Sequence, residues 1–221
     1  MKRNVDLSEI SDGKLYSVKD MAKLGCQECA GCSSCCKGMG NSIVLDPYDV
    51  YRIGKKLQKG FEELLTAHIE LNVVDGIILP NLKLTGPNEA CTFLNSEGRC
   101  SIHDSRPGIC RLFPLGRYYE NSDYKYFLQV DECKKQNRTK VKIEKWIDTP
   151  GYPRYKEFIL NWHYFLNDVE EKIKNAEDEE FGKQCCMLIL QAFYIKPYDY
   201  TRDFYDQYEE RMQMCQFLKA L

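Results

Sequence analysis

A run of closely spaced cysteines near the N-terminus has the clearest chemistry in this sequence. Cys29, Cys32, Cys35 and Cys36 form the pattern Cys-x2-Cys-x2-Cys-Cys, and Cys26 precedes them at the same spacing. Two intervening residues let one backbone turn direct both sulfurs toward a single ion, as in zinc knuckles and ferredoxin loops. The run therefore predicts a metal site with thiolate ligands.

Later cysteines can complete such a site when the chain folds back. They are Cys91, Cys100, Cys110 and Cys133. A zinc ion or an iron–sulfur cluster takes about four thiolates, so the run and the later cysteines together supply more than enough sulfur. Neighbouring side chains tend to point apart. Of Cys35 and Cys36, we therefore expect one to serve the site while the other packs or faces a second site.

The cysteine content is high, 12 of 221 residues, and its meaning depends on the compartment. Secreted chains use clustered cysteines for disulfides, whereas thiols stay reduced in the cytoplasm and serve metal or redox chemistry. Residues 1–10 are polar and charged and lack the apolar segment of a secretion signal. No stretch approaches the apolar length that spans a bilayer. We therefore expect a cytoplasmic protein with no membrane contact.

Charge and motif content exclude several classes of function. The formal net charge is -2, which gives no basic footprint for nucleic acid. The sequence has no Gly-x-Ser-x-Gly elbow, no P-loop and no dinucleotide-binding fingerprint. Metal binding is thus the main chemistry that the residues themselves predict.

Short helices and hairpins are expected to carry the cysteines. Residues 43–45 predict a strand, and Asp46 followed by Pro47 predicts a helix start, with a second helix over residues 61–68. Asp75-Gly76 between two apolar runs predicts a hairpin. Two further hairpins are expected, over residues 91–102 with a turn at 95–98 and over residues 116–130 with a turn at 121–123.

Helical periodicity dominates the chain after about Pro153. Apolar side chains recur at helical spacing over residues 158–173, 181–192 and 204–218, which predicts three helices. The fold class expected is α+β: a loop-rich cysteine-cluster domain with short helices and small β-hairpins, followed by a mostly α-helical extension. We place an N-terminal segment at 1–25, the metal-binding domain at 26–150 and the helical region at 151–221.

Four pieces of this sequence together resemble a known family. They are Cys29-x2-Cys32-x2-Cys35-Cys36, Cys91-Thr-Phe-Leu, Gly98-Arg99-Cys100-Ser101-Ile102 and Arg106-Pro107-Gly108-Ile109-Cys110-Arg111-Leu112-Phe113-Pro114. The combination looks like the YkgJ-type cysteine-cluster family, a zinc- or iron-chelating domain, from Cys29 to about Cys133. The resemblance implies that the family's metal ligands are Cys29, Cys32, Cys35, Cys36, Cys91, Cys100, Cys110 and Cys133.

The residues leave the metal open between two candidates. The Cys-x2-Cys-x2-Cys run with a distant fourth cysteine resembles the loop of a [4Fe–4S] cluster, and zinc is equally suited to four thiolates. Relatives that carry this domain include flagellin lysine methylases, which favours the iron–sulfur cluster. The guanidinium groups of Arg106, Arg111 and Arg117 can hydrogen-bond to thiolates or sulfides, and Arg106 and Arg111 are the candidate cofactor-binding residues. Each of the three could instead hold a carboxylate or a phosphate.

Three functions are compatible with this reading. The first is a metal-binding protein without its own catalysis, with a redox, accessory or metal-handling role. The second is a metal-dependent enzyme such as a protein lysine N-methylase, which the family resemblance alone suggests. The third is a zinc-stapled module whose C-terminal helices bind an unidentified protein partner. Cys185, Cys186 and Cys215 lie on apolar helix faces and are expected to pack in the core.

Overall fold

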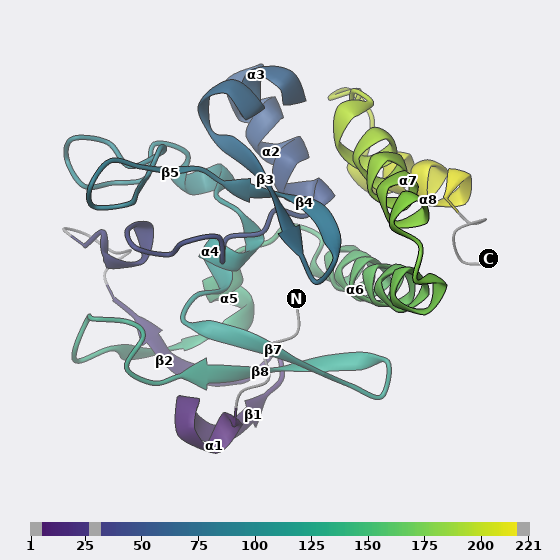
Figure 1. Ribbon diagram of the computed structural model, residues 1–221. Coiled ribbons are helices and arrows are strands. Elements are labelled where there is room, and N and C mark those ends of the chain that lie inside the picture. The colour runs from purple at the N-terminus through teal and green to yellow at the C-terminus, as the bar shows by residue number, and fades with distance from the viewer. Residues whose placement is uncertain (1–5, 27–31, 216–221) are drawn as a thin grey trace.

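The computed structural model describes residues 6–26 and 32–215, and its elements lie in two layers flanked by helices (Figure 1). The helices are α1 (Leu7–Ile10), η2 (Ser34–Cys36), α2 (Pro47–Leu57), α3 (Phe61–Ala67), η3 (His103–Ser105), α4 (Gly108–Leu112), α5 (Ile143–Ile147), α6 (Tyr152–Ala176), α7 (Glu179–Leu190), η4 (Gln191–Ile195) and α8 (Phe204–Met214). The strands are β1 (Ser11–Tyr16), β2 (Met21–Gly25), β3 (Ile69–Val74), β4 (Ile77–Leu82), β5 (Leu84–Thr85), β6 (Ala90–Cys91), β7 (Leu115–Glu120), β8 (Asp123–Gln129) and β9 (Thr139–Lys142). The fold is α+β, as predicted.

The strands form small antiparallel sheets that join distant parts of the chain. One sheet has the order β1-β8-β7, and the others are the pairs β2-β9, β3-β4 and β5-β6. Tyr16 pairs with Tyr126, and Met21 pairs with Lys142. The segment before the cysteine run therefore closes one layer of the domain, a pairing that the sequence analysis did not predict.

Local sequence signals fix the elements that were predicted correctly. Asp46 caps α2 by accepting the backbone N–H of Asp49 at 2.8 Å, and Pro47 occupies the first turn. Asp75 and Gly76 have positive φ in the turn between β3 and β4, as a two-residue hairpin requires. The predicted hairpin over residues 116–130 is β7–β8, which turns at residues 121–122.

Two expectations about strands were wrong in detail. Residues 43–45 make only a single bridge, between Val44 and Asn81, and form no strand. The chain does reverse at residues 95–98, where the Asn95 side chain accepts the backbone N–H of Arg99 at 2.8 Å. No two-stranded ladder follows, because residues 84–85 rather than 100–102 pair with the strand that holds Cys91.

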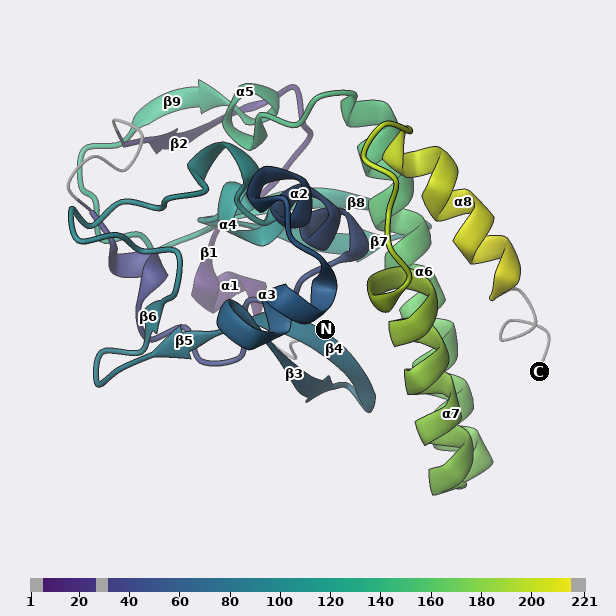
Figure 2. The same ribbon diagram turned by 90° about the horizontal axis from the view of Figure 1, so that it is seen from above.

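The three predicted C-terminal helices are confirmed and stand along one side of the molecule (Figure 2). They share an aromatic core: the Phe158 ring lies 4.7 Å from Tyr208, and the Trp162 ring lies 4.9 Å from Phe193. The core continues into the cysteine region, because the hydroxyl of Tyr194 donates to the backbone oxygen of Leu45 at 3.0 Å. Within the described residues, no helix combines the length and apolar character needed to cross a bilayer.

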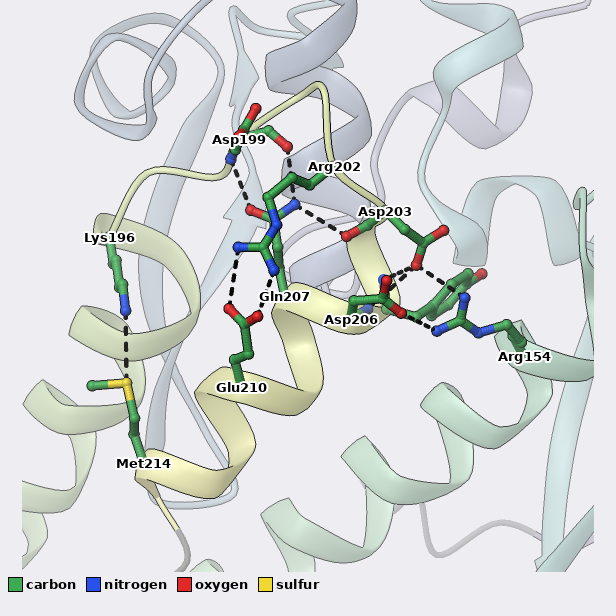
Figure 3. Close-up of polar contacts among 10 residues, drawn as sticks. Arg154, Lys196, Asp199, Arg202, Asp203, Asp206, Gln207, Glu210 and Met214 are labelled. Carbon is green, nitrogen blue, oxygen red and sulfur yellow. Dashed lines mark hydrogen bonds and ion pairs between the residues drawn. The ribbon is translucent and has the colours of Figure 1, made fainter.

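Ion pairs hold the start of α8 against α6 (Figure 3). Arg154 donates to Asp206 at 2.8 Å and lies 3.1 Å from the Asp203 carboxylate. Arg202 pairs with Glu210 one turn further along α8. These groups are exposed, so each pair contributes little alone, and together they orient α8.

Candidate metal centre

A cavity of about 660 Å³ lies between the two layers of the fold and collects most of the predicted metal ligands at one end. The cysteines that line it are Cys32, Cys35, Cys36, Cys91, Cys100 and Cys110. They come from four separate segments of the chain. The tertiary structure therefore gathers thiols that are up to 78 residues apart in sequence.

Backbone pairing brings the cysteine run to Cys91. The N–H of Gly38 donates to the Glu89 oxygen at 3.1 Å, and Lys37 forms an antiparallel bridge with Ala90. The short helix η2 carries Cys35 and Cys36 directly before this contact. The two segments are thus held side by side with their cysteines at the cavity.

Cys100 and Cys110 reach the same cavity from a turn and a short helix. Cys100 bridges to Leu94 across the turn at residues 95–98. Cys110 lies in α4, and the first N–H of α4, that of Gly108, donates to the buried Asp49 carboxylate at 2.7 Å. Asp49 therefore ties the helix that carries Cys110 to the start of α2.

Four of the cavity thiols have a raised pKa, and a neighbouring thiol contributes to each of these shifts. Burial is the largest cause that raises the pKa of Cys110 well above its ordinary value, followed by the charge of Cys91, with contributions from Cys35 and Cys100. Burial likewise raises the pKa of Cys91 and of Cys100. For Cys35 the hydrogen bond with Cys36 is the largest cause, and burial comes second. We call Cys35, Cys91, Cys100 and Cys110 the thiol quartet.

The thiol quartet has one arginine as its electrostatic neighbour. The charge of Arg106 acts against the raised pKa of both Cys35 and Cys100. The guanidinium donates to the His103 ring at 3.1 Å, and its buried Nε atom has no hydrogen-bond partner among the described residues. Arg106 is therefore an electrostatic neighbour of the thiols. Arg111 is only 3% exposed, does not line the cavity and donates to the Asp148 backbone oxygen at 3.2 Å.

The remaining cysteines lie elsewhere or outside the described residues. Cys29 falls within residues 27–31, which the structure does not describe. Cys133 and Cys26 are partly buried and do not line the cavity. Cys185, Cys186 and Cys215 are buried in the helical core, where the sequence analysis placed them. Of the predicted ligands, six therefore share one cavity, and Cys133 does not join them.

The donor set suits thiophilic metals. Within residues 6–26 and 32–215, no group of three or more His, Cys, Asp or Glu side chains is already arranged to coordinate a metal ion. The thiol quartet nevertheless offers four sulfurs at one cavity wall, which is the number that zinc or a [4Fe–4S] cluster takes. The residues present therefore fit either group, with Cys32 and Cys36 as further sulfur donors beside them.

A comparison with protein families gives the same assignment. Residues 28–143 match the model of the CxxCxxCC domain, described as "Putative zinc- or iron-chelating domain". The match spans just over half of the chain. The chain belongs to the CxxCxxCC family. Zinc or iron chelation is thus supported at the level of the family, and the matched range contains every cysteine of the thiol quartet. No curated protein and no solved structure matches the chain.

Two carboxylates of the cavity lining, one partly buried and one buried, were not singled out as site residues by the sequence analysis. Asp46 and Asp49 line it, and sequence reasoning treated Asp46 only as a helix cap. The spacing Asp-Pro-x-Asp is the signal that was available, because it predicts the reciprocal capping box that the structure contains. Burial, and then the charge of Asp49, raise the pKa of Asp46 to about 8.

We expect this raised pKa to make stability fall with pH. The folded chain holds a proton on Asp46 that the unfolded chain loses near 3.8, so the free energy of unfolding falls as pH rises from about 4 to about 8. The slope is at most about 1.4 kcal/mol per pH unit for one proton. Asp46→Asn keeps the cap and removes the titration. Urea unfolding at pH 5.5 and pH 8.0 measures the free energy of unfolding of both proteins. The value for the variant should rise relative to that of the wild type between the two pH values, and an unchanged difference between them would contradict this prediction.

Proposed function

We propose that this protein binds a [4Fe–4S] cluster through the thiol quartet, in a redox, accessory or metal-handling role in the cytoplasm. The observation that carries the proposal is the convergence of Cys35, Cys91, Cys100 and Cys110 on one wall of the cavity. Zinc through the same ligands is the alternative. A reducing compartment suits either group, because both need thiolates rather than disulfides.

Room at the thiols supports the cluster over a single ion. Zinc holds each sulfur at about 2.3 Å, so four thiolates must converge on one point. A four-iron cluster is larger and its sulfur ligands stand further apart. The thiol quartet borders a cavity of about 660 Å³, which leaves room beside the sulfurs for a group larger than a single ion. This room suits the cluster.

The protein's own residues would prepare the site in two ways. The raised pKa of each thiol in the quartet keeps the metal-free site protonated near neutral pH, so binding must release protons. The Arg106 guanidinium would donate hydrogen bonds to sulfur and offset part of the negative charge that four thiolates bring. An iron–sulfur cluster, when bound, supplies electron transfer at a potential that such hydrogen bonds tune.

Optical and metal analysis of protein purified without oxygen tests this proposal. We expect a brown sample that absorbs at about 400 nm and contains iron and acid-labile sulfide in equal amounts. Bleaching by dithionite would show that the centre is redox-active. A colourless sample with stoichiometric zinc would replace the cluster by the zinc alternative, and a sample without either metal would contradict the metal site itself.

A further inference from the structure

The cavity extends well beyond the thiol quartet, to the long helix α6. The walls away from the sulfurs are mostly apolar. Their side chains include Leu79, Leu82, Phe127, Ile159, Trp162 and Leu166. Phe127 packs directly against Gly116, where any side chain would displace the ring. A volume of about 660 Å³ lies in the range of small-molecule sites. The thiols occupy one end, which leaves an apolar chamber at the other.

One charged side chain of the lining, Arg117, forms no ion pair among the described residues. Arg117 projects from β7 into the cavity lining, and its buried Nε atom has no hydrogen-bond partner among the described residues. Over the same residues, no carboxylate lies within 4 Å of its guanidinium. A buried charge without a partner is unfavourable. The arginine is therefore kept in an environment that an anion would improve.

The neighbours of Arg117 satisfy it only in part. It donates to the hydroxyl of Tyr155 at 3.0 Å, and its guanidinium lies 5.5 Å from the Tyr124 ring and 5.8 Å from the Tyr155 ring. Aromatic faces attract a cation but carry no net charge. Asp46 also lines the cavity and its charge attracts Arg117, but its carboxylate accepts the Asp49 N–H at 2.8 Å and forms no ion pair with the guanidinium within 4 Å. None of these groups replaces a bound anion.

We propose that this chamber binds a small monocarboxylic acid with an apolar body, whose carboxylate pairs with Arg117. A guanidinium matches a carboxylate in charge and in the spacing of its donors. A phosphate carries nearly two charges and needs a second cation. The other arginines of the lining, Arg99 and Arg106, belong to the thiol end, beside Cys100. The apolar walls exclude a highly polar ligand and suit a hydrocarbon or aromatic body. The proposal adds a ligand to the proposed function and does not depend on which metal the thiols hold.

Decanoate and decanol are the probes that test this site on the purified full-length protein. Calorimetry should show decanoate binding once per chain. Decanol, which has the same chain and no charge, should bind the wild type at least about tenfold more weakly. Arg117→Met should remove this preference by weakening decanoate at least about tenfold, and Arg202→Met, the same change at an exposed arginine outside the cavity, should leave it intact. Trp162 lines the cavity and gives an independent fluorescence readout.

A second measurement separates a binding role of Arg117 from a structural one. If Arg117 serves binding, replacing this unpaired charge should leave the melting temperature of the ligand-free Arg117→Met protein equal to that of the wild type or higher. If Arg117 is structural, the same substitution should lower the melting temperature. Equal binding of decanoate and decanol by the wild type, which needs no variant, would overturn the proposal. So would unchanged decanoate binding by Arg117→Met. Metal analysis of the same samples keeps the two proposals apart: decanoate binding without iron or zinc would contradict only the metal site.

Discussion

Cys110→Ser should lose most of its bound metal and melt roughly 10 °C below the wild type. Cys110 belongs to the thiol quartet, and three other quartet members affect its pKa. Because a structural metal ties distant segments together, loss of one ligand removes both metal and folding energy. Metal analysis and thermal unfolding on the same preparation measure the two losses together.

Cys185→Ser is the matched control for this prediction. Cys185 is 2% exposed in α7 and does not line the cavity that holds the thiol quartet. Serine at this core position should lower the melting temperature through lost packing and leave the metal content unchanged. If Cys110→Ser retained full metal occupancy, the quartet would not be the site, whatever happened to its stability.

Asp49→Ala should destabilise the protein by about 3 kcal/mol and lower its metal content as well. The Asp49 carboxylate is 2% exposed and accepts two backbone N–H groups, from Gly108 at 2.7 Å and from Asp46 at 3.3 Å. Alanine leaves both donors without a partner and frees the helix that carries Cys110. Urea unfolding measures the first effect, and metal analysis of the folded protein measures the second.

Asp49→Asn separates the hydrogen bonds from the charge. The amide oxygen of asparagine can still accept the Gly108 N–H, so α4 keeps its attachment to α2. Burial raises the pKa of Asp49, so the fold disfavours the charge on this side chain, which asparagine lacks. We expect this variant to retain metal and most of its stability. Asp104→Asn, at an exposed ion pair with Lys56, should change neither. Equal damage from Asp49→Asn and Asp49→Ala would contradict the hydrogen-bond explanation.

The cysteine pattern and several elements could be predicted because their causes are local. The capping signal of Asp46 and Pro47 set the start of α2, and Asp75-Gly76 set the first hairpin. Apolar periodicity gave the C-terminal helices for the same reason. A cap, a turn and a helical stripe each depend on residues only a few positions apart, so a single sequence contains the whole signal.

Strand pairing across the domain was not predictable in the same way. β1 pairs with β8 and β2 pairs with β9, over separations of more than 100 residues. Cys91 lies in a two-residue strand that pairs with residues 84–85, where the sequence suggested a partner near Ile102. Such short strands have little periodicity of their own, and their partners are selected by packing rather than by a turn.

The richness in thiol ligands, the CxxCxxCC family and the helical C-terminal region can all be read from the order of the residues. Which thiols meet depends on how the chain folds. A backbone hydrogen bond from Gly38 to Glu89, and one from the Gly108 N–H to the Asp49 carboxylate, join segments that no motif connects. Tertiary structure also placed Arg117 in the lining of a largely apolar cavity, where it forms no ion pair among the described residues. Residue type fixes what a side chain can bind, but burial and neighbours, which depend on the whole fold, decide whether it is placed to do so.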